Sequence, residues 1–373
     1  MSEADQHQGF TGTMPVSDRY RFALHPLETW MQERIAAFAG PLQVEQFRGG
    51  QSNPSFLLCT PTRRYVMRSK PGPAAKLLPS AHAIEREYRV LAALADTPVP
   101  VPRVLGLCED ESVIGRAFYI MEYVDGLVHW DQSLKAIARE HRKAIYTAMN
   151  RTLAELHRID ARRVGLEDFG KPGNYFARQI NRWTRQYLDS ETEPIESMHR
   201  LIAWLPANIP PGEESCIVHG DFRLDNLIFA PMAQGDSRTK CGEDPHAQVR
   251  AVLDWELSTL GHPLADFSYH CMAWHIPPGV FRGIAGLDLV ALGIPQEQEY
   301  LELYCAATGR NIDELMHHWN FYLAYNMFRL AGILQGIMKR VLEGTAASER
   351  ARESGQRARP MADMGWEMVR RMA

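Results

Sequence analysis

The chain has 373 residues, of which 45% are hydrophobic and 23% are charged, so it has ample material for a folded core and is neither disordered nor fibrous. Lys and Arg total 41 against 45 Asp and Glu, and the formal net charge of -4 argues against a protein that binds nucleic acid chiefly through its phosphates. The six cysteines show no Cys-x-x-Cys spacing, which argues against a zinc knuckle or a disulfide framework and indicates a reducing compartment.

The beginning of the chain and its most apolar segment bear on localisation. The first thirty residues carry charges such as Asp5 and Asp18 and lack the apolar core of a secretion signal, so we expect a cytoplasmic protein. The most apolar stretch, residues 321–338, includes Asn326 and Arg329 within its span. This pattern predicts a buried core helix and no membrane partner.

The first third of the chain favours antiparallel hairpins with two helices. Apolar residues recur at helical spacing in the helices, and turn residues separate the strands. We expect helices at 27–38 and 83–95, and strands at 44–47, 55–59, 65–68 and 117–124. The pair Asp125-Gly126 follows the last strand and predicts a boundary between a first lobe, residues 27–124, and a second lobe, residues 125–373.

The second lobe has mainly helical periodicity. Long helices are expected at 134–158 and 174–188, and short strand pairs within 215–230 and 249–261. The last segment, 346–373, mixes apolar residues with several arginines and predicts a solvated terminal helix.

The strongest chemical signal is the segment HGDFRLDN, residues 219–226, which apolar flanks hold as a polar turn between strands. It places Asp221 and Asn226 at the two ends of the turn. A carboxylate can accept a proton from a hydroxyl nucleophile, and an amide oxygen is a suitable ligand for Mg²⁺. Further on, LDWE places Asp254 at the end of an apolar strand, where a carboxylate can bind Mg²⁺ beside nucleotide phosphates. We expect these three side chains to converge.

Both motifs resemble those of the aminoglycoside phosphotransferase and choline kinase branch of the protein-kinase-like fold. The segments VHGDFRLDNLIF and VLDWELSTLGHPLADFSY are especially similar to the phosphotransferase domain fused to some acyl-CoA dehydrogenases. The resemblance covers residues 28–342. It implies an α+β, two-lobed protein-kinase-like fold, with a small antiparallel-sheet N-lobe, a larger mainly helical C-lobe and ATP between them.

The same resemblance implies roles for the motif residues. Asp221 would be the catalytic base, and Asn226 and Asp254 would hold Mg²⁺. The acceptor would be a hydroxyl of a small molecule, with a hydroxyacyl-CoA or a related hydroxy acid derivative as the first choice. The pattern makes no prediction of the oligomeric state.

A turn between the first two strands of this lobe, RGGQSN, is the expected phosphate-binding loop. Its small residues would let backbone amides approach the triphosphate, although a Gly-Gly pair between strands is also an ordinary hairpin turn. The predicted nucleotide-binding residues here are Gly49, Gly50, Ser52 and Asn53.

The resemblance also implies a strand cation paired with a helix carboxylate. Arg68 stands where the kinase pattern has lysine, and Lys70 lies two residues further on the same face. We favour Arg68 because Pro71 indicates that the strand ends there. For the helix partner we favour Glu87 over Glu85, which lies about 200° around the helix at ~100° per residue.

The strand that ends the first lobe is the expected hinge. Glu122 and Val124 would offer backbone groups to the adenine edge, although a buried strand would show the same apolar residues. Near the motif, His219 is expected to orient the turn, and Asp266 resembles the family's buried acid that braces the catalytic loop.

Two other functions stay open at this point. One is a nucleotide-binding module that keeps the kinase shape without transfer, suggested by Arg68 in place of lysine. The other is a metal-dependent phosphoester hydrolase. Its metal ligands would be His219, Asp221, Asp254 and His262.

Overall fold

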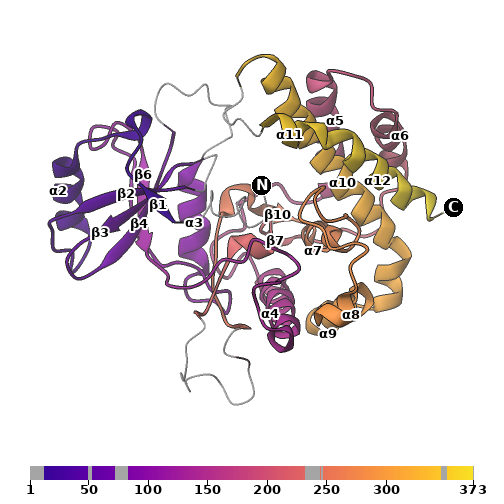
Figure 1. The fold of residues 1–373 in the computed structure, drawn as a ribbon, viewed down its shortest axis with the longest axis horizontal. Coiled ribbons are helices and arrows are strands. Elements are labelled where there is room, and N and C mark those ends of the chain that lie inside the picture. The colour runs from indigo at the N-terminus through magenta and orange to yellow at the C-terminus, as the bar shows by residue number, and fades with distance from the viewer. Residues whose placement is uncertain are drawn as a thin grey trace.

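The structure is a computed structural model, and it describes residues 12–48, 53–71, 83–231, 244, 247–345 and 351–372. Over these residues the chain forms a sheet-rich lobe from its first third and a mainly helical lobe from the remainder (Figure 1). The predicted two-lobed α+β architecture is therefore confirmed.

One antiparallel sheet of six strands forms the first lobe, in the order β1-β2-β3-β4-β6-β5. The strands are β1 (Thr13–Met14), β2 (Gln43–Phe47), β3 (Ser55–Cys59), β4 (Arg64–Ser69), β5 (Val104–Cys108) and β6 (Phe118–Glu122). The helical segments of this lobe are η1 (Asp18–Tyr20), α2 (Leu24–Arg34) and α3 (Ile84–Leu94). The limits of the lobes, residues 27–124 and 125–373, stay predictions; β1 lies ahead of the first limit and joins the same sheet.

Alternation along the strands divides the first lobe into two apolar faces. Met67 and Ile120 are paired across β4 and β6, and both belong to the cluster that packs under α2 with Trp30. The neighbouring residue Val66 belongs instead to the core shared with α3 and the second lobe. Arg68, two residues beyond Val66 on the same strand, consequently faces the second lobe.

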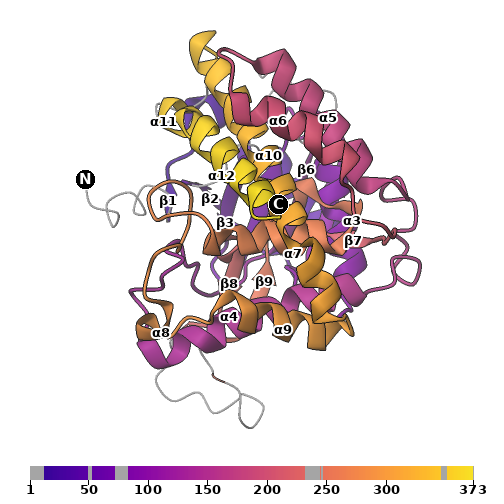
Figure 2. The same cartoon turned by 90° about the vertical axis from the view of Figure 1, so that its right-hand side faces the viewer.

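The second lobe is built around one long helix, α10, which contacts α5, α7, α11 and α12 (Figure 2). Its helices are α4 (Arg139–Arg158), α5 (Tyr175–Ser190), α6 (Glu196–Trp204), α7 (Pro263–Cys271), α8 (Leu289–Leu292), α9 (Glu297–Thr308), α10 (Ile312–Leu342), α11 (Ala351–Gln356) and α12 (Ala358–Arg370). Shorter 3-10 turns are η2 (Leu205–Ala207), η3 (Leu224–Asn226), η5 (Trp255–Leu257) and η6 (Met272–Trp274).

The apolar segment 321–338 lies inside α10, and most of its side chains are buried, as the sequence predicts. The polar residues within it have partners: Asn326 donates to the carbonyl of Ala265 (2.9 Å) and to Ser268 (2.8 Å), which anchors α10 to α7. Within the described ranges, no helix combines the length and the apolar character needed to cross a bilayer.

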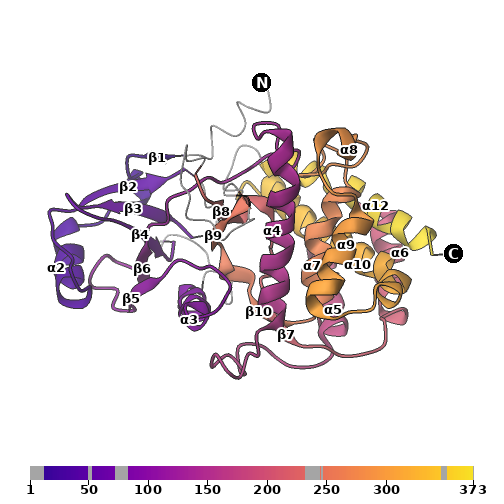
Figure 3. The ribbon, with the colours of Figure 1, turned by 90° about the horizontal axis from the view of Figure 1, so that it is seen from below.

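Two short antiparallel strand pairs lie between the large sheet and the helices (Figure 3). β7 (Cys216–Val218) pairs with β10 (Thr259–Gly261), and β8 (Leu227–Phe229) pairs with β9 (Val249–Val252). The register aligns Leu227 with Val252, so the end of the first motif lies beside the start of the second. The strand pairing therefore brings together motifs that are separated in the sequence.

Several expectations about individual elements need correction. The helix expected at 27–38 is α2, which begins at Leu24 and ends at Arg34. The strand pairs expected within 215–230 and within 249–261 form instead between these two segments. β5 was not among the expected strands, because Gly106 and the prolines before it weaken the strand pattern. A Cβ at Gly106 would lie 2.9 Å from the ring of Trp30, so a larger residue there would have to displace this buried ring. The helix expected from residue 134 begins at Arg139. The last segment is helical but not fully solvated, because Met361 and Met368 of α12 are buried against the helices of this lobe.

Candidate active site

A glycine and a buried carboxylate shape the loop that follows β7. Gly220 has φ +84°, and a Cβ there would lie 2.7 Å from the carbonyl oxygen of Leu257, so the turn needs glycine. Asp266 on α7 accepts hydrogen bonds from the backbone N–H groups of His219 (2.6 Å) and Gly220 (2.8 Å). Burial alone would raise the pKa of Asp266, but the hydrogen bonds from His157 and from the His219 backbone outweigh burial and lower it. Asp266 is therefore an ionised brace beneath the loop.

His219 uses both ring nitrogens within the loop. Nδ1 accepts from the backbone N–H of Asp221 (3.2 Å), so Nε2 carries the proton and donates to the carbonyl of Leu253 (2.8 Å). The ring is buried. His219 therefore links the two motifs and has no free nitrogen for a metal or a substrate.

The carboxylate of Asp221 lies at the centre of the loop and is partly exposed. Its Oδ1 accepts from the hydroxyl of Tyr269 (2.7 Å), and its Oδ2 lies 3.1 Å from the guanidinium of Arg223. Burial and the charge of Asp221 raise the pKa of Tyr269 well above its ordinary value, so this tyrosine keeps its proton and acts as the donor. These contacts fix the direction of the carboxylate that would receive the proton of an acceptor hydroxyl.

Asn226 and Asp254 lie side by side because the backbone N–H of Leu253 donates to the carbonyl of Asn226 (2.8 Å). The amide nitrogen of Asn226 donates to the carbonyl of Asp221 (2.8 Å), and this leaves its Oδ1 as an oxygen ligand. Asp254 has φ +65°, a left-handed conformation that aspartate tolerates better than most residues. Both residues line the same cavity.

This pair of oxygen donors fits Mg²⁺, which commonly takes one or two carboxylates and completes its shell with waters and substrate phosphates. Across the residues for which the structure gives positions, no three His, Cys, Asp or Glu side chains cluster as they would around an ion. A cation here would therefore depend on one carboxylate, one amide oxygen and the phosphates of a bound nucleotide.

Arg68 joins the two lobes through three carboxylates. Its Nε lies 2.7 Å from Glu87, and its Nη2 lies 2.7 Å from Asp254 and 3.3 Å from Glu256. Burial alone would lower the pKa of Arg68, but the charges of Glu87 and Asp254 raise it above its ordinary value, so the guanidinium stays charged. The pairing agrees with the preference for Arg68 over Lys70, which binds Glu85 in a more exposed ion pair.

Glu87 is held in the first lobe by two further donors. The amide of buried Asn53 donates to Oε1 (2.8 Å), and the hydroxyl of Tyr119 donates to Oε2 (3.1 Å). Asn53 therefore supports the ion pair. Of the predicted phosphate-binding loop, Gly49, Gly50 and Ser52 lie outside the described residues.

A cavity of about 500 Å³ runs between the lobes and ends at these charged groups. This volume is within the range of small-molecule sites. Apolar side chains from both lobes face it, including Val66 and Ile228, and the predicted hinge residues Glu122 and Val124 also line it. One cavity therefore contacts the hinge, Arg68, Asn226 and Asp254, while Asp221 lies beside Asn226.

Sequence reasoning did not assign Tyr269 and Arg329 to the site. Arg329 donates from α10 to the carbonyl of Gly220 (2.7 Å), and its guanidinium lies 5.1 Å from the centre of the Tyr269 ring. Tyr269 follows Asp266 by three residues, a spacing that puts both on one helix face and could have indicated its place. Arg329 gave no such signal, because its contact depends on how α10 packs.

A family model described as "Phosphotransferase enzyme family" matches residues 43–315. The chain belongs to this family. A protein from Ralstonia eutropha, provisionally named an aminoglycoside phosphotransferase, has a solved structure that is 57% identical, with a TM-score of 0.82, and the match covers 94% of this chain and 99% of that one. The family and the fold resemblance predicted from the two motifs are therefore confirmed.

Two other members of the comparison differ in length or in sequence. Acyl-CoA dehydrogenase family member 10 of Mus musculus is 44% identical over 367 residues, which is 97% of this chain but 33% of that protein. The chain thus spans about a third of that relative. Choline kinase from Cryptosporidium parvum is 10% identical with a TM-score of 0.63, over 94% of this chain and 96% of that one, and shares the fold.

Proposed function

We propose that the protein transfers the γ-phosphoryl group of ATP to a hydroxyl of a small-molecule acceptor. The observation that carries this proposal is the convergence of Asp221, Asn226, Asp254 and Arg68 at one end of the cavity between the lobes. Phosphoryl transfer depends mainly on positioning and charge stabilisation, and these residues offer both.

In this mechanism the acceptor oxygen attacks the γ-phosphorus, the bond to the bridging oxygen breaks, and ADP leaves. Asp221 orients the acceptor hydroxyl and accepts its proton, while Tyr269 and Arg223 hold the carboxylate in place. Asn226 and Asp254 would hold Mg²⁺, which neutralises charge on the phosphates. Arg68 adds a permanent positive charge at the phosphates.

The hinge residues complete the nucleotide site in this proposal. The backbone of Glu122 and Val124 would meet the adenine edge, and apolar side chains such as Val66 and Ile228 would cover its faces. The expected loop of Gly49, Gly50, Ser52 and Asn53 would approach the phosphates. Asn53 supports Glu87 as well.

For the acceptor we propose a hydroxyacyl-CoA or a related hydroxy acid derivative. The likeness to acyl-CoA dehydrogenase family member 10 supports this choice. The two alternatives have less support. A two-metal hydrolase would need His219 as a ligand, yet both of its nitrogens are engaged. A silent module has no chemical need for Asp221, Asn226 and Asp254 together.

An ADP-release screen with Mg-ATP tests the proposal, using hydroxyacyl-CoAs, aminoglycosides, choline-like alcohols and sugars as acceptors. Asp221→Ala is the blank, and Asp18→Ala, at a largely exposed ion pair, is the matched control. We expect Asp221→Ala to abolish transfer and retain ATP binding, and Asp254→Ala to weaken Mg-ATP binding as well. Turnover at the wild-type rate in Asp221→Ala, or phosphoester hydrolysis without ATP, would contradict the proposal.

A further inference from the structure

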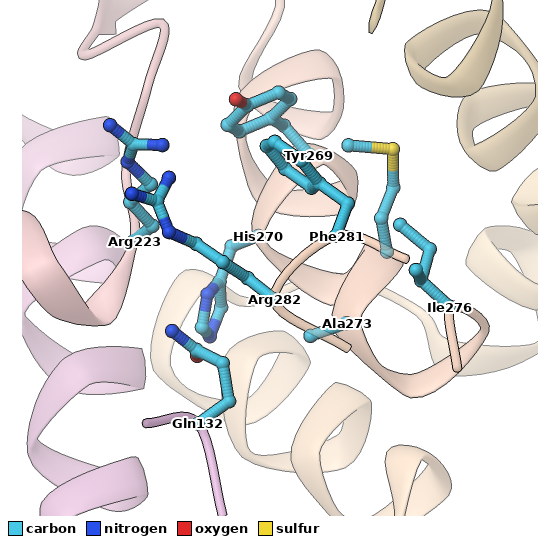
Figure 4. A pocket seen from close by; sticks show the side chains of 9 residues that line it. Gln132, Arg223, Tyr269, His270, Ala273, Ile276, Phe281 and Arg282 are labelled. Carbon is cyan, nitrogen blue, oxygen red and sulfur yellow. The ribbon is translucent and has the colours of Figure 1, made fainter. Parts of the chain in front are cut away.

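A second, narrower pocket lies beside Asp221 on the side of the helical lobe (Figure 4). Two residues that line it, Arg223 and Tyr269, are the same residues that contact the Asp221 carboxylate. A group bound in this pocket would therefore lie next to the proposed base. Its volume of about 30 Å³ is that of a single small group, so it would hold one part of an acceptor rather than the whole molecule.

The charged side chains among the nine that line this pocket are both arginines, Arg223 and Arg282. Both point to the same carboxylate: Arg223 lies 3.5 Å and Arg282 lies 2.8 Å from buried Asp225. Figure 4 shows the two side chains on the same side of the pocket. A third guanidinium, that of Arg329, lies 5.1 Å from the centre of the Tyr269 ring.

Arg282 has donors to spare. Its side chain is about one-third exposed, and the ion pair that the structure gives it engages one nitrogen, Nη2, with one oxygen of Asp225. A guanidinium carries five N–H donors in a planar fork. The remaining donors of Arg282 can therefore bind an oxygen acceptor in the pocket without release of Asp225.

The backbone holds Arg282 in an unusual conformation, with φ +39° in the left-handed region. The next residue must be glycine, because a Cβ at Gly283 would lie 1.7 Å from the carbonyl oxygen of Ile276. The backbone N–H groups of Ile284 and Ala285 donate to the carbonyls of Ala273 (2.8 Å) and Ile276 (3.0 Å), which ties the loop to η6. Such strained and over-determined positions cluster at functional sites.

The remaining wall of the pocket is mainly apolar, with Met272, Ile276 and Phe281. We propose that this pocket recognises the acceptor through an acyl oxygen, of a carboxylate or a thioester, which Arg282 binds while the apolar wall covers the adjoining hydrocarbon. The inference rests on the proposed function and deepens it. Arg282 is thus a specificity-determining residue that disfavours polycationic acceptors.

Paired acceptors test this inference. The acceptors are 3-hydroxybutyrate, 3-hydroxyoctanoate, their CoA thioesters, and the matching 1,3-diols, which lack the acyl oxygen. We expect wild-type protein to show a KM for the acyl compounds at least about tenfold below that for the diols. The acid and thioester arms show which source of the acyl oxygen is preferred.

Arg282→Gln should raise the KM for the acyl compounds about tenfold and change the KM for the diols less than about twofold. Arg282→Lys keeps the charge beside Asp225 and should restore only part of the preference, since lysine lacks the planar fork. Arg163→Gln, at a largely exposed arginine, is the matched control. An equal rise for acyl compounds and diols would mean a structural role, and that result or an unchanged preference would overturn the inference.

Calorimetric binding of the same compounds to the complex with Mg-AMP-PNP separates the two proposals. If wild-type protein releases no ADP with any acceptor but binds acyl compounds in an Arg282-dependent manner, the proposed function fails and the inference stands. If neither the acids nor the thioesters bind more tightly than the diols, the inference fails, whatever the transfer assay shows.

Discussion

The guanidinium of Arg68 in the first lobe lies 2.7 Å from the carboxylate of Asp254 in the second, although 186 residues separate them in the chain. The same side chain lies 2.7 Å from Glu87 through a different nitrogen. Arg68, which lies on β4, therefore connects helix α3 of the first lobe with Asp254, the proposed ligand of the cation.

Arg68→Lys is expected to weaken nucleotide binding. A single ammonium cannot contact Glu87 and Asp254 with separate nitrogens, so we expect the KM for Mg-ATP to rise about tenfold, equivalent to about 1.4 kcal/mol. Steady-state kinetics at varied ATP measure the change. Arg63→Lys, at an exposed arginine just before the same strand, is the matched control. A KM equal to that of the control would show that the fork geometry is unimportant.

Tyr269→Phe should lower kcat and leave ATP binding intact. The change removes the hydroxyl that donates to Asp221 and retains the ring that contacts Arg329. We expect kcat to fall about tenfold and the KM for ATP to stay within about twofold of the wild-type value. The reason is that the Tyr269 hydroxyl positions Asp221, the proposed base, and does not contribute to nucleotide binding. Tyr187→Phe removes a comparable hydrogen bond to Glu191, away from the site, and should leave kcat unchanged. Equal kcat values in the two variants would remove Tyr269 from the mechanism.

Asp266→Asn should destabilise the protein and reduce its activity together. The amide would place N–H donors opposite the donors of His219, Gly220 or His157, and one buried group would lose its partner. We expect the free energy of unfolding in urea to fall by about 3 kcal/mol. Asp288→Asn, where asparagine can cap α8 equally well, should change it by less than about 0.5 kcal/mol. Similar losses in the two variants would contradict the bracing role.

His262→Asn should make the free energy of unfolding depend less on pH between 4 and 6.5. Burial lowers the pKa of His262 to about 4, below its ordinary value of 6.5, so the unfolded chain binds a proton between these pH values that the folded protein does not. Stability therefore falls as the pH drops from 6.5 to 4, by up to about 3 kcal/mol from this residue.

Asparagine can accept the same hydrogen bond from Leu264 at the start of α7 and does not titrate. Loss of the packing of the imidazole ring lowers the free energy of unfolding by an amount that is the same at all pH values. Urea unfolding at several pH values between 4 and 7 measures the slope, and His317→Asn, at an exposed histidine, is the control. A slope as steep in His262→Asn as in the control would refute the assignment.

Sequence patterns predicted most strands of the first lobe and helix α3 closely, because the strands alternate and are separated by turn residues. Helix α2 was predicted less well, since it runs from Leu24 to Arg34 and not over 27–38. β3 has the predicted bounds, and β4 and α3 differ from the prediction by about one residue at each end. β5 was missed, since its glycine serves the packing of Trp30 and weakens the local strand signal. A long-range contact thus decided a local element.

Asp221, Asn226 and Asp254 could be predicted from the sequence because they belong to short motifs with a fixed order and spacing. Arg282 and Arg329 could not, because each reaches the site from a loop or helix whose position depends on tertiary packing. Tyr269 was also missed, although its spacing of three residues from Asp266 could have indicated it. The acidic partners of Arg68 also illustrate this limit: helical spacing favours Glu87, but no pattern in the chain indicates Glu256.

The bridge from Arg68 to Asp254 has a consequence for how the protein would load its substrate. In the proposed mechanism, the carboxylate of Asp254 that pairs with Arg68 across the two lobes is also the carboxylate that would bind Mg²⁺. Binding of Mg-ATP would then replace the contact between Arg68 and Asp254 by one between Mg²⁺ and Asp254. Nucleotide binding would thus weaken the ionic link between the two lobes in the same step.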